Sequence, residues 1–406
     1  MRPMRQNELA GGEAVPPAAQ PRPGARNATL LATSVLTIMS AATIAPALPA
    51  MQAHFAGTDQ VALMTRLVLT IPALAIALVA LPAGGIIDRW GRRPFLIGAI
   101  GLYGIAGMSG LVLDSLGAIL AGRALLGVAV AMIMTTATAL VGDYLAGPAR
   151  DRFLGLQSAA IGGGGLLCLT GGGLLAEIDW RAPFAIYGMA FLLLPAVIAF
   201  IAEPARGTAV RPEPRGATHG SPAALTLLLT AAVLNSIIFY LVPTQLPFHL
   251  RELGHAEPSR AGLAIGLFTL AQAVVSLGFG RLRRSWSSTT LFGIGFGLMA
   301  TGYGFVAMAE SYAAVVAAIV VTGFGMGLVI PNLGATALTV APPALRGRVA
   351  GGLTASIFLG QFLSPLVSQP WIGAFGYAAT FRDMAVALAA MAVTGLVLAG
   401  HGRARS

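Results

Sequence analysis

Charge is scarce in this 406-residue chain, and one basic residue type is missing altogether. Asp, Glu, Lys and Arg together make up 10% of the residues, and all 25 basic residues are arginines because the sequence contains no lysine. A soluble domain carries about 25% charged residues, which help to cover a surface exposed to water. With 56% hydrophobic residues and a mean hydropathy of +0.80, the composition instead predicts an integral membrane protein.

Groups that bind metals, cofactors or nucleic acid are also few. A single cysteine, Cys168, excludes a disulfide framework and a cysteine-based zinc site, and the five histidines lack metal-ligand spacing. The sequence has no GxSxG, no His–Glu metal motif and no phosphate-binding loop with lysine. The net charge of +10 does not indicate nucleic acid, because no aromatic residues alternate with the arginines. We therefore expect a protein that is not an enzyme and has no cofactor and no metal.

Long apolar runs fill most of the chain. A helix that crosses the hydrocarbon core needs roughly 20 apolar residues. Such runs are found at 29–52, 60–84, 94–113, 115–141, 152–176, 181–202, 224–248, 260–280, 288–309, 311–340, 345–369 and 379–400. The sequence thus predicts an all-α integral membrane fold with twelve transmembrane helices.

Polar stretches divide the chain into predicted domains. The Pro-, Ala- and Arg-rich start has no apolar core of signal-peptide length and indicates a disordered tail. A second polar stretch, EPARGTAVRPEPRGATHGSP, separates two sets of six spans. The predicted domains are a cytoplasmic tail at 1–27, a six-helix bundle at 28–202, a cytoplasmic linker at 203–222, a second six-helix bundle at 223–401 and a tail at 402–406.

The arginines predict the topology. If the N-terminus is inside, 19 arginines fall in cytoplasmic segments and five on the opposite side, with Arg123 left within a span. Short loops rich in arginine stay on the cytoplasmic side of a membrane. We therefore expect a multi-pass protein of the cell inner (cytoplasmic) membrane with both termini in the cytoplasm.

The two halves resemble each other at one fixed offset. A shift of 196 residues aligns Gly84 with Gly280, Arg150 with Arg346, Arg152 with Arg348 and Gly155 with Gly351. Each match lies in corresponding loops, which indicates an internal duplication. Two repeats related by an axis along the membrane normal are expected to hold a solute between them near the midplane.

The loop between the second and third spans carries the most specific motif. It reads GGIIDRWGRRPFL at 84–96, and it matches the pattern G-x-L-A-D-R-x-G-R-K/R-x-x-L at Gly84, Asp88, Arg89, Gly91, Arg92, Arg93 and Leu96. On this motif and the duplicated twelve-span pattern, the chain resembles the major facilitator superfamily of secondary transporters. The second half holds a degenerate copy, GRLRRSW, with Arg284 in place of Asp88. The resemblance covers the chain beyond the N-terminal tail.

The resemblance implies that this loop is a conformational latch. Asp88 would rest on the positive N-terminal end of the eleventh span, near Gly347 and Gly351. Arg92 would pair with Asp143 at the cytoplasmic end of the fourth span. These contacts would hold the two halves together in one state and break in the other. The alternative is that the loop residues only fix topology.

Arg123 lies within the fourth span in the segment LAGRALLGVAVA. Drug–proton antiporters of the superfamily have R-x-x-Q-G here, and this chain keeps Arg123 and Gly127 with Leu126 in place of glutamine. An arginine in hydrocarbon is costly and indicates function, so we expect it to take part in proton coupling or to bind an anionic substrate group. The alternative is an arginine that snorkels to the interface. The middles of the first, fourth, fifth, seventh and tenth spans contain no acidic residue to carry a proton.

Polar residues within other spans are candidates for a substrate cavity. They are Arg66, Thr70, Gln157, Asn235, Tyr240, Gln245, Gln272, Asn332 and Gln361. In the superfamily the first, fourth, seventh and tenth helices line the cavity. Each of these side chains could instead make a hydrogen bond between helices.

Together these features favour a secondary transporter that works by alternating access. The preferred hypothesis is proton-coupled efflux of a small amphiphilic drug-like compound or a secreted metabolite, by a protein that acts as a monomer in the lipid bilayer. One alternative is a proton-coupled or facilitated importer of a sugar or organic acid with the same fold. A more distant alternative is a membrane receptor that transports nothing.

Overall fold

The computed structural model describes residues 23–204, 222–342 and 345–403, and within these ranges it is helical with no strand. The helices in chain order are α1 Pro23–Ala42, η1 Ala45–Ala47, α2 Leu48–His54, α3 Val61–Trp90, α4 Arg92–Met108, η2 Ser109–Leu111, α5 Leu116–Tyr144, α6 Gly147–Ile178, η3 Ala182–Gly188, α7 Met189–Phe200, α8 Pro222–Phe239, α9 Leu241–Glu252, α10 Pro258–Ser285, α11 Ser288–Met308, α12 Tyr312–Val340 and α13 Arg346–Arg403. The predicted all-α membrane fold is confirmed.

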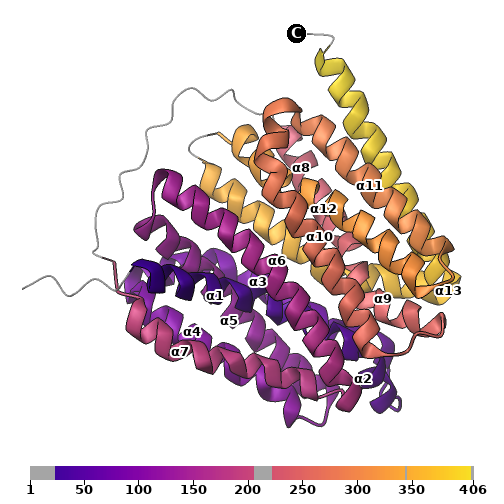
Figure 1. The fold of residues 1–406 in the computed structure, drawn as a ribbon, viewed down its shortest axis with the longest axis horizontal. Helices are drawn as coiled ribbons and strands as arrows, with labels where there is room; N and C mark the ends of the chain where they lie inside the picture. The colour runs from indigo at the N-terminus through magenta and orange to yellow at the C-terminus, as the bar shows by residue number, and fades with distance from the viewer. Residues whose placement is uncertain (1–22, 205–221, 343–344, 404–406) are drawn as a thin grey trace, which may run out of the picture.

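The last helix accounts for two of the twelve predicted spans. The described residues contain 11 helical segments long and apolar enough to cross a membrane, and α13 alone has 58 residues. A straight helix of that length would extend about 87 Å, whereas the hydrocarbon core is about 30 Å thick. Gly376 breaks the helix with φ 79°, a left-handed value that suits glycine. Figure 1 shows the result, with the yellow final arm of α13 turning back toward the C-terminus.

Two predicted spans are interrupted at equivalent positions. The first span is divided between α1 and α2 around Ile44, and the seventh is divided between α8 and α9 at Tyr240. These residues are related by the same offset of 196 that aligns the loop motifs. Prolines follow each break, Pro46 in the first half and Pro243 in the second, and a proline is best tolerated at the start of a new helix. The duplication therefore extends to the backbone of the helices.

Domain boundaries differ from the predicted ones by a few residues. Helix α1 begins at Pro23, within the segment predicted to be a tail, and α13 continues to Arg403. The rest of the predicted tails and most of the linker, residues 1–22, 205–221 and 404–406, lie outside the described residues. Proline and arginine are tolerated in the first and last turns of a helix, so composition alone places such ends poorly.

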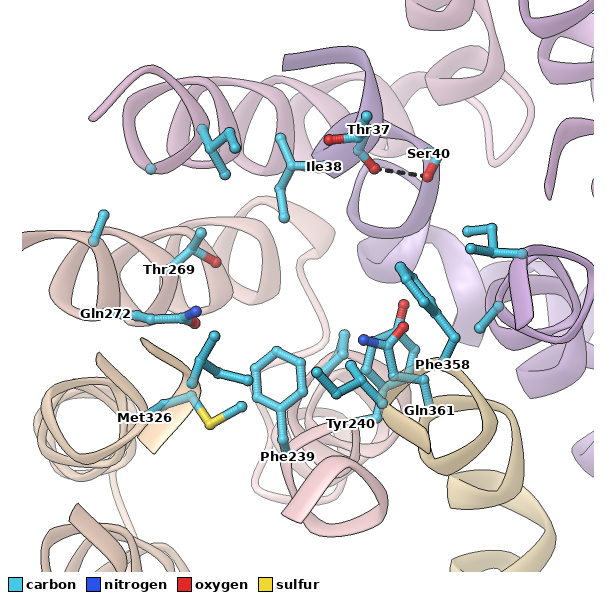
Figure 2. A pocket seen from close by; sticks show the side chains of 18 of the residues that line it. Thr37, Ile38, Ser40, Phe239, Tyr240, Thr269, Gln272, Met326, Phe358 and Gln361 are labelled. Atoms are coloured by element: carbon cyan, nitrogen blue, oxygen red, sulfur yellow. Dashed lines mark hydrogen bonds between the residues drawn. The ribbon is translucent and has the colours of Figure 1, made fainter. Parts of the chain in front are cut away.

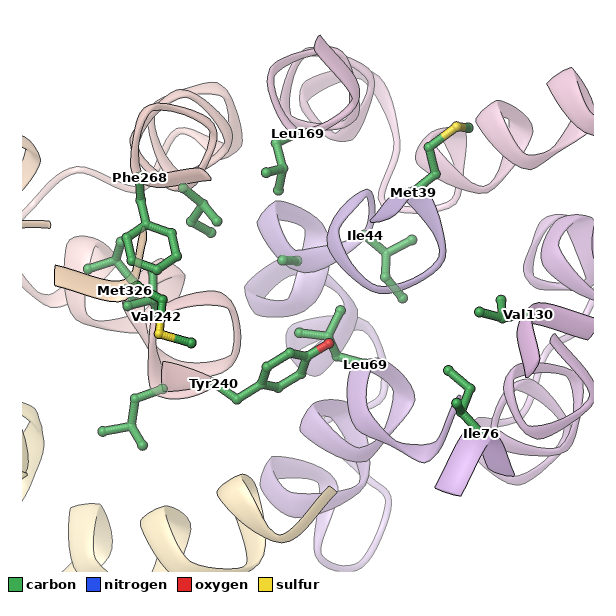
Figure 3. Packing of buried hydrophobic residues seen from close by; sticks show 14 of the residues in the cluster. Met39, Ile44, Leu69, Ile76, Val130, Leu169, Tyr240, Val242, Phe268 and Met326 are labelled. Carbon is green, nitrogen blue, oxygen red and sulfur yellow. The ribbon is translucent and has the colours of Figure 1, made fainter. Parts of the chain in front are cut away.

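A single cluster of buried apolar side chains extends through both halves. It includes Met39 and Val130 from the first half and Phe268 and Met326 from the second. Figure 3 shows Tyr240 projecting from the second half toward Leu69 and the helices of the first half. The two bundles are thus packed against each other.

We call the end of the bundle with the connections at 91, 145–146 and 286–287 the inner end, and the opposite end the outer end. Helices α6 and α10 pack tightly toward the outer end. A methyl group at Gly262 would lie 2.3 Å from the carbonyl oxygen of Leu169, and one at Gly173 would lie 2.7 Å from that of Pro258. Toward the inner end a methyl group at Gly280 would meet nothing within 4 Å. In Figure 1 the two helices lie side by side and diverge toward their inner ends.

Candidate functional site

A cavity of about 530 Å³ lies between the two bundles. Figure 2 shows side chains from both halves around it, including Thr37 and Ile38 from α1 and Thr269 and Gln272 from α10. Aromatic and sulfur-containing side chains form much of its second-half wall, namely Phe239, Phe268, Met326 and Phe358. A volume of this size accommodates a drug-sized molecule.

None of the described side chains in the wall of this cavity is charged. Most of its hydroxyl groups are already used: Thr37, Ser40 and Thr269 each donate to a carbonyl oxygen of their own helix. The side-chain amides of Gln272 and Gln361 make no hydrogen bond within the described part of the chain. They are therefore available to a ligand. The sequence-predicted residues that line the cavity are thus Tyr240, Gln272 and Gln361.

A second hollow of about 480 Å³ extends from this cavity toward the inner end. The two share Ile76, Met134 and Thr354 in their walls. The second one continues to Gly347 and Gly351 at the start of α13. The space between the bundles therefore continues to the inner end, between α3, α5 and α13.

Arg66 closes the outer end by joining the two bundles. Its side chain, on α3, is 1% exposed. Its Nε donates to Gln245 Oε1 of α9 at 2.8 Å, and one terminal nitrogen donates to the Tyr377 hydroxyl of α13 at 2.9 Å. Its guanidinium also lies over the ring of Phe248, 3.7 Å from the ring centre. We call the contacts of Arg66 with Gln245, Phe248 and Tyr377 the outer contact.

Neighbouring groups support the outer contact. The other terminal nitrogen of Arg66 donates to Gln52 Oε1 at 2.8 Å, and the amide of Gln245 donates to Ser368 Oγ at 2.9 Å. Tyr377 follows the break at Gly376 directly, so the turn of α13 delivers its ring to this end. Arg66 and Gln245, both predicted to line the cavity, are instead absent from its wall. The side chain of an arginine is long, and that of Arg66 extends from α3 to contact α9 and α13 of the second bundle.

A buried histidine lies beside the outer contact. His249 of α9 is 4% exposed, and the backbone of Val306 is within reach of its ring, although neither ring nitrogen makes a hydrogen bond of ordinary geometry within the described residues. Its ring packs against Tyr377 and Phe381 of α13, with ring centres 5.9 and 5.4 Å apart. The titratable groups around it are thus Tyr377, the guanidinium of Arg66 that binds Tyr377, and Glu252 one turn along α9.

Arg123 is fully buried and binds backbone carbonyls. Its Nε donates to the carbonyl of Val68 at 3.0 Å, and a terminal nitrogen donates to that of Ser40. Both carbonyls lack a helical partner: Pro72, four residues after Val68, has no N–H, and α1 ends two residues after Ser40. The second terminal nitrogen donates to the Tyr187 hydroxyl at 2.8 Å. Arg123 therefore satisfies two orphaned carbonyls and does not reach the cavity wall.

Gly127, the glycine that accompanies Arg123 in the motif, lies where α5 approaches α3 closely. A methyl group at Gly127 would lie 2.4 Å from the carbonyl oxygen of Pro72. Helices α3 and α5 can approach this closely only because Gly127 has no side chain. The pattern of Arg123 and Gly127 thus fits the bend of α3 at its proline.

The motif loop between α3 and α4 is fixed by an acidic residue that follows α7. Glu203 accepts hydrogen bonds at 2.7 Å from the backbone N–H groups of both Arg92 and Arg93, at the N-terminus of α4. Gly91 turns the chain with φ 90°, and a side chain there would meet the Glu203 carboxylate at 3.2 Å. The side chain of Arg92 forms an ion pair with Asp143 of α5, the pair that the sequence predicts.

The predicted latch is described only in part. The Arg92–Asp143 pair joins two helices of the first bundle. Gly347 and Gly351 line the hollow at the inner end. The structure describes the backbone at Gly84 and Asp88 but not the side chain of Asp88. Arg89 is exposed at the end of α3.

The remaining candidates of the predicted cavity make contacts between or within helices. The amide of Gln157 donates to Ser34 Oγ at 2.7 Å, and that of Asn235 lies 3.7 Å from the sulfur of Met326. Asn332 accepts from Arg283 at 2.7 Å and donates to the carbonyl of Ser288 at 2.8 Å. The hydroxyl of Thr70 is buried without a hydrogen-bond partner. None of these four side chains lines the cavity.

Several residues at the outer end and at the loop between α3 and α4 were not predicted from the sequence. They are Gln52, Glu203, Phe248, His249, Ser368 and Tyr377. Glu203 was hidden because it lies where the last apolar span meets the polar linker. The outer contact could have been predicted in part. An arginine within an apolar span needs hydrogen-bond acceptors, and a glutamine at a similar depth in the membrane can supply one. No group of three His, Cys, Asp or Glu able to hold a metal ion is found within the described ranges.

Comparison with known proteins covers almost the whole chain. The sequence profile of the Major Facilitator Superfamily matches residues 30–256 and 228–404. The tetracycline resistance protein, class C, of Escherichia coli is 26% identical over 355 residues, which cover 83% of this chain and 87% of that protein. The puromycin resistance protein pur8 of Streptomyces alboniger is 32% identical over 155 residues, but the match spans only 37% of this chain and 30% of that protein.

Solved structures share the fold at low sequence identity. A bacterial homologue of the human lysosomal transporter Spinster, in an inward-facing and occupied conformation, superposes with a TM-score of 0.74 at 16% identity. The match covers 92% of this chain and 96% of that one. At this identity the likeness concerns the fold alone.

Proposed function

The chain belongs to the major facilitator superfamily, and from this membership we propose that it exports small amphiphilic compounds from the cytoplasm by alternating access. It is a multi-pass membrane transporter and not an enzyme. Within the proposal, the inner end faces the cytoplasm and the membrane is the cell inner membrane, since the arginine-rich loops lie at the inner end.

One observation carries the proposal: the space between the bundles is closed at one end and open at the other. The outer contact joins α3 to α9 and α13, whereas the cavity continues to the inner end. This is the arrangement of a carrier in its inward-open state. In the outward-open state the outer contact would break and the inner ends of the bundles would meet.

Export of an amphiphile follows from the wall of the cavity together with the relatives. The wall is mostly apolar and aromatic with a few amides and hydroxyls, which suits a molecule with a large apolar surface. The relatives with the broadest match include a tetracycline resistance protein, and resistance by a membrane carrier requires outward movement of the drug. Import of a sugar is less consistent with this wall, because a sugar needs many hydrogen-bonding partners and only two free amides are present.

Proton coupling is part of the proposal. The sequence has no nucleotide-binding loop, so a gradient is the energy source that remains for uphill export. In this scheme Arg123 positions α1 against α3 and α5, and the Asp88 loop with the Arg92–Asp143 pair closes the inner end in the outward-open state. The monomer holds the complete cavity, so one chain is the functional unit.

The test uses everted membrane vesicles that contain the protein in an inward-acidic proton gradient. A pH-sensitive fluorophore reports the gradient while tetracycline, chloramphenicol, a sugar or an organic acid is added. We expect the amphiphiles, and not the sugar, to dissipate the gradient. Dissipation by the sugar alone would contradict an amphiphilic substrate, because only exchange of the added compound for a luminal proton consumes this gradient. No response to any compound by folded protein would contradict proton-coupled export.

Arg66→Ala and Arg181→Ala make a matched pair for this assay. Both arginines lie at the outer end, but Arg181 bonds only within the first bundle, to Asp114 and to carbonyls of residues 111 and 113. The alternating-access proposal predicts loss of compound-dependent dissipation in Arg66→Ala and near wild-type activity in Arg181→Ala. Equal activity of the two variants would remove the outer contact from the transport cycle.

A further inference from the structure

We propose that the cavity selects uncharged aromatic amphiphiles with a hydrogen-bonding group at each end, and that Gln272 and Gln361 recognise those groups. This inference rests on the proposed function, because it names the substrate class of the same cavity. It adds a charge preference and assigns two specificity-determining residues.

The first observation is the absence of any charge from the wall. A cation that enters this cavity loses its hydration and finds no carboxylate among the lining residues. Transfer of an ion into an apolar site without a partner costs far more than transfer of a neutral molecule. The wall therefore disfavours permanent cations.

The second observation is the positive charge of two buried arginines of the first bundle, Arg66 on α3 and Arg123 on α5. Arg123 donates to the carbonyl of Ser40, and Ser40 lines the cavity. Arg66 is buried on the same helix as the lining residues Leu69 and Pro72. Neither guanidinium has an acidic partner within the described ranges, so both raise the potential at the cavity and oppose a cation further.

The same potential attracts an anion, but the two arginines offer it no hydrogen bond to replace its lost hydration. The nitrogens of Arg66 donate to two glutamines, to a tyrosine hydroxyl and to the carbonyl of Ala62, and those of Arg123 donate to two carbonyls and a tyrosine. Neither side chain lines the wall, so an anion in the cavity would obtain no direct hydrogen bond from them. A neutral ligand is the class that remains.

The third observation is the placement of the two free amides. Gln272 projects from α10 and Gln361 from α13, with the ring of Phe239 between them in Figure 2. Each amide has a donor and an acceptor without a partner within the described chain. An aromatic ligand that stacks on Phe239 can therefore place one polar group on each glutamine.

The experiment measures equilibrium binding to the purified full-length chain in lipid nanodiscs. The neutral probe is radiolabelled chloramphenicol, an uncharged aromatic with hydroxyl and amide groups, and the cationic probe is radiolabelled tetraphenylphosphonium. We expect the neutral probe to bind at least tenfold more tightly than the cation. Tighter binding of the cation, or no binding of the neutral probe, would overturn the inference.

Three variants test the glutamines. Gln272→Leu and Gln361→Leu should each weaken binding of the neutral probe by about three- to tenfold, the value of one neutral hydrogen bond. Gln361→Glu should reverse the preference in favour of the cation, a gain that a misfolded protein cannot show. Gln369→Leu, on α13 but outside the wall, is the control and should bind as wild type.

Unchanged binding in both leucine variants would overturn the assignment of the glutamines. The binding assay requires neither a gradient nor a direction of transport. A protein that binds as expected but exports nothing would contradict the proposed function and leave the substrate class in place, whereas export of tetraphenylphosphonium would contradict the substrate class alone.

Discussion

Replacement of Arg66 by alanine should open the outer end of the transporter. Arg66 is the side chain that donates from the first bundle to both α9 and α13 of the second. Without it, Gln245 Oε1 and the Tyr377 hydroxyl lose a charged donor, and the ring of Phe248 loses the guanidinium that covers it. The inward-open state should therefore become less stable relative to the outward-open state.

The size of this shift can be worked out from the contacts. A hydrogen bond to a charged group contributes about 1.5–3 kcal/mol, and a desolvated cation–π contact contributes about 2 kcal/mol. Hydrogen bonds between membrane helices average about 0.6 kcal/mol, and contributions of one side chain are not additive. We therefore expect a shift of about 2–4 kcal/mol, which corresponds to about 30- to 1000-fold in the equilibrium between the two states.

Distance measurements between spin labels can report this shift. The single cysteine makes labelling simple, because Cys168→Ser gives a background without reactive thiols. Cysteines at the exposed positions Asp59 and Glu310 report the outer end, and cysteines at Ala149 and Ser285 report the inner end. Arg66→Ala should lengthen the outer distance and shorten the inner one.

Arg181→Ala in the same backgrounds is the control. It removes an arginine of the outer end whose recorded bonds stay within the first bundle. Its distances should match those of the parent protein. If Arg66→Ala also leaves the inner and the outer spin-label distances unchanged, the outer contact does not stabilise the inward-open state.

Three further predictions concern other parts of the structure. Gly127→Ala should lower the free energy of unfolding by about 1–3 kcal/mol, because its methyl group would meet the backbone of Pro72; an unchanged melting temperature would contradict this. Glu203→Gln should lower the melting temperature, because the first turn of α4 loses a charged cap worth about 1 kcal/mol, and a stable variant would refute the role of Glu203. Acidic pH should open the outer end, because protonation adds a charge to the buried ring of His249 beside Tyr377. His249→Phe should remove this pH response of the outer spin-label distance, and persistence of the response would assign it to another group.

The fold was predictable from the sequence because hydrophobic length and arginine distribution are local signals. Apolar runs of about 20 residues mark the helices wherever they pack. The breaks at Ile44 and Tyr240 were less visible, since they interrupt apolar runs without changing composition. Their equivalence at an offset of 196 shows that the repeat could have located them.

The outer contact was not predictable to the same extent. Arg66, Gln245 and Tyr377 are far apart in the sequence, and the turn at Gly376 decides where Tyr377 lies. A polar residue within a span needs a hydrogen-bond partner. The sequence does not show whether that partner is a ligand in a cavity or a side chain of another helix.

Arg123 illustrates the same limit. Its charge marked it as important, and its partners turned out to be carbonyls released by Pro72 and by the end of α1. Such orphaned carbonyls can be recognised in a sequence only when the helix that faces the arginine is already known.

The most direct test of alternating access uses one cysteine in the cavity. Thr269→Cys in the Cys168→Ser background places a thiol on the wall, and a membrane-impermeant maleimide is applied to everted and to right-side-out vesicles. We expect labelling from the inner side at rest, and labelling from the outer side only when a proton gradient drives turnover or when Arg66 is replaced by alanine. Equal labelling from both sides at rest, or labelling from the outer side alone, would contradict an inward-open carrier closed by Arg66.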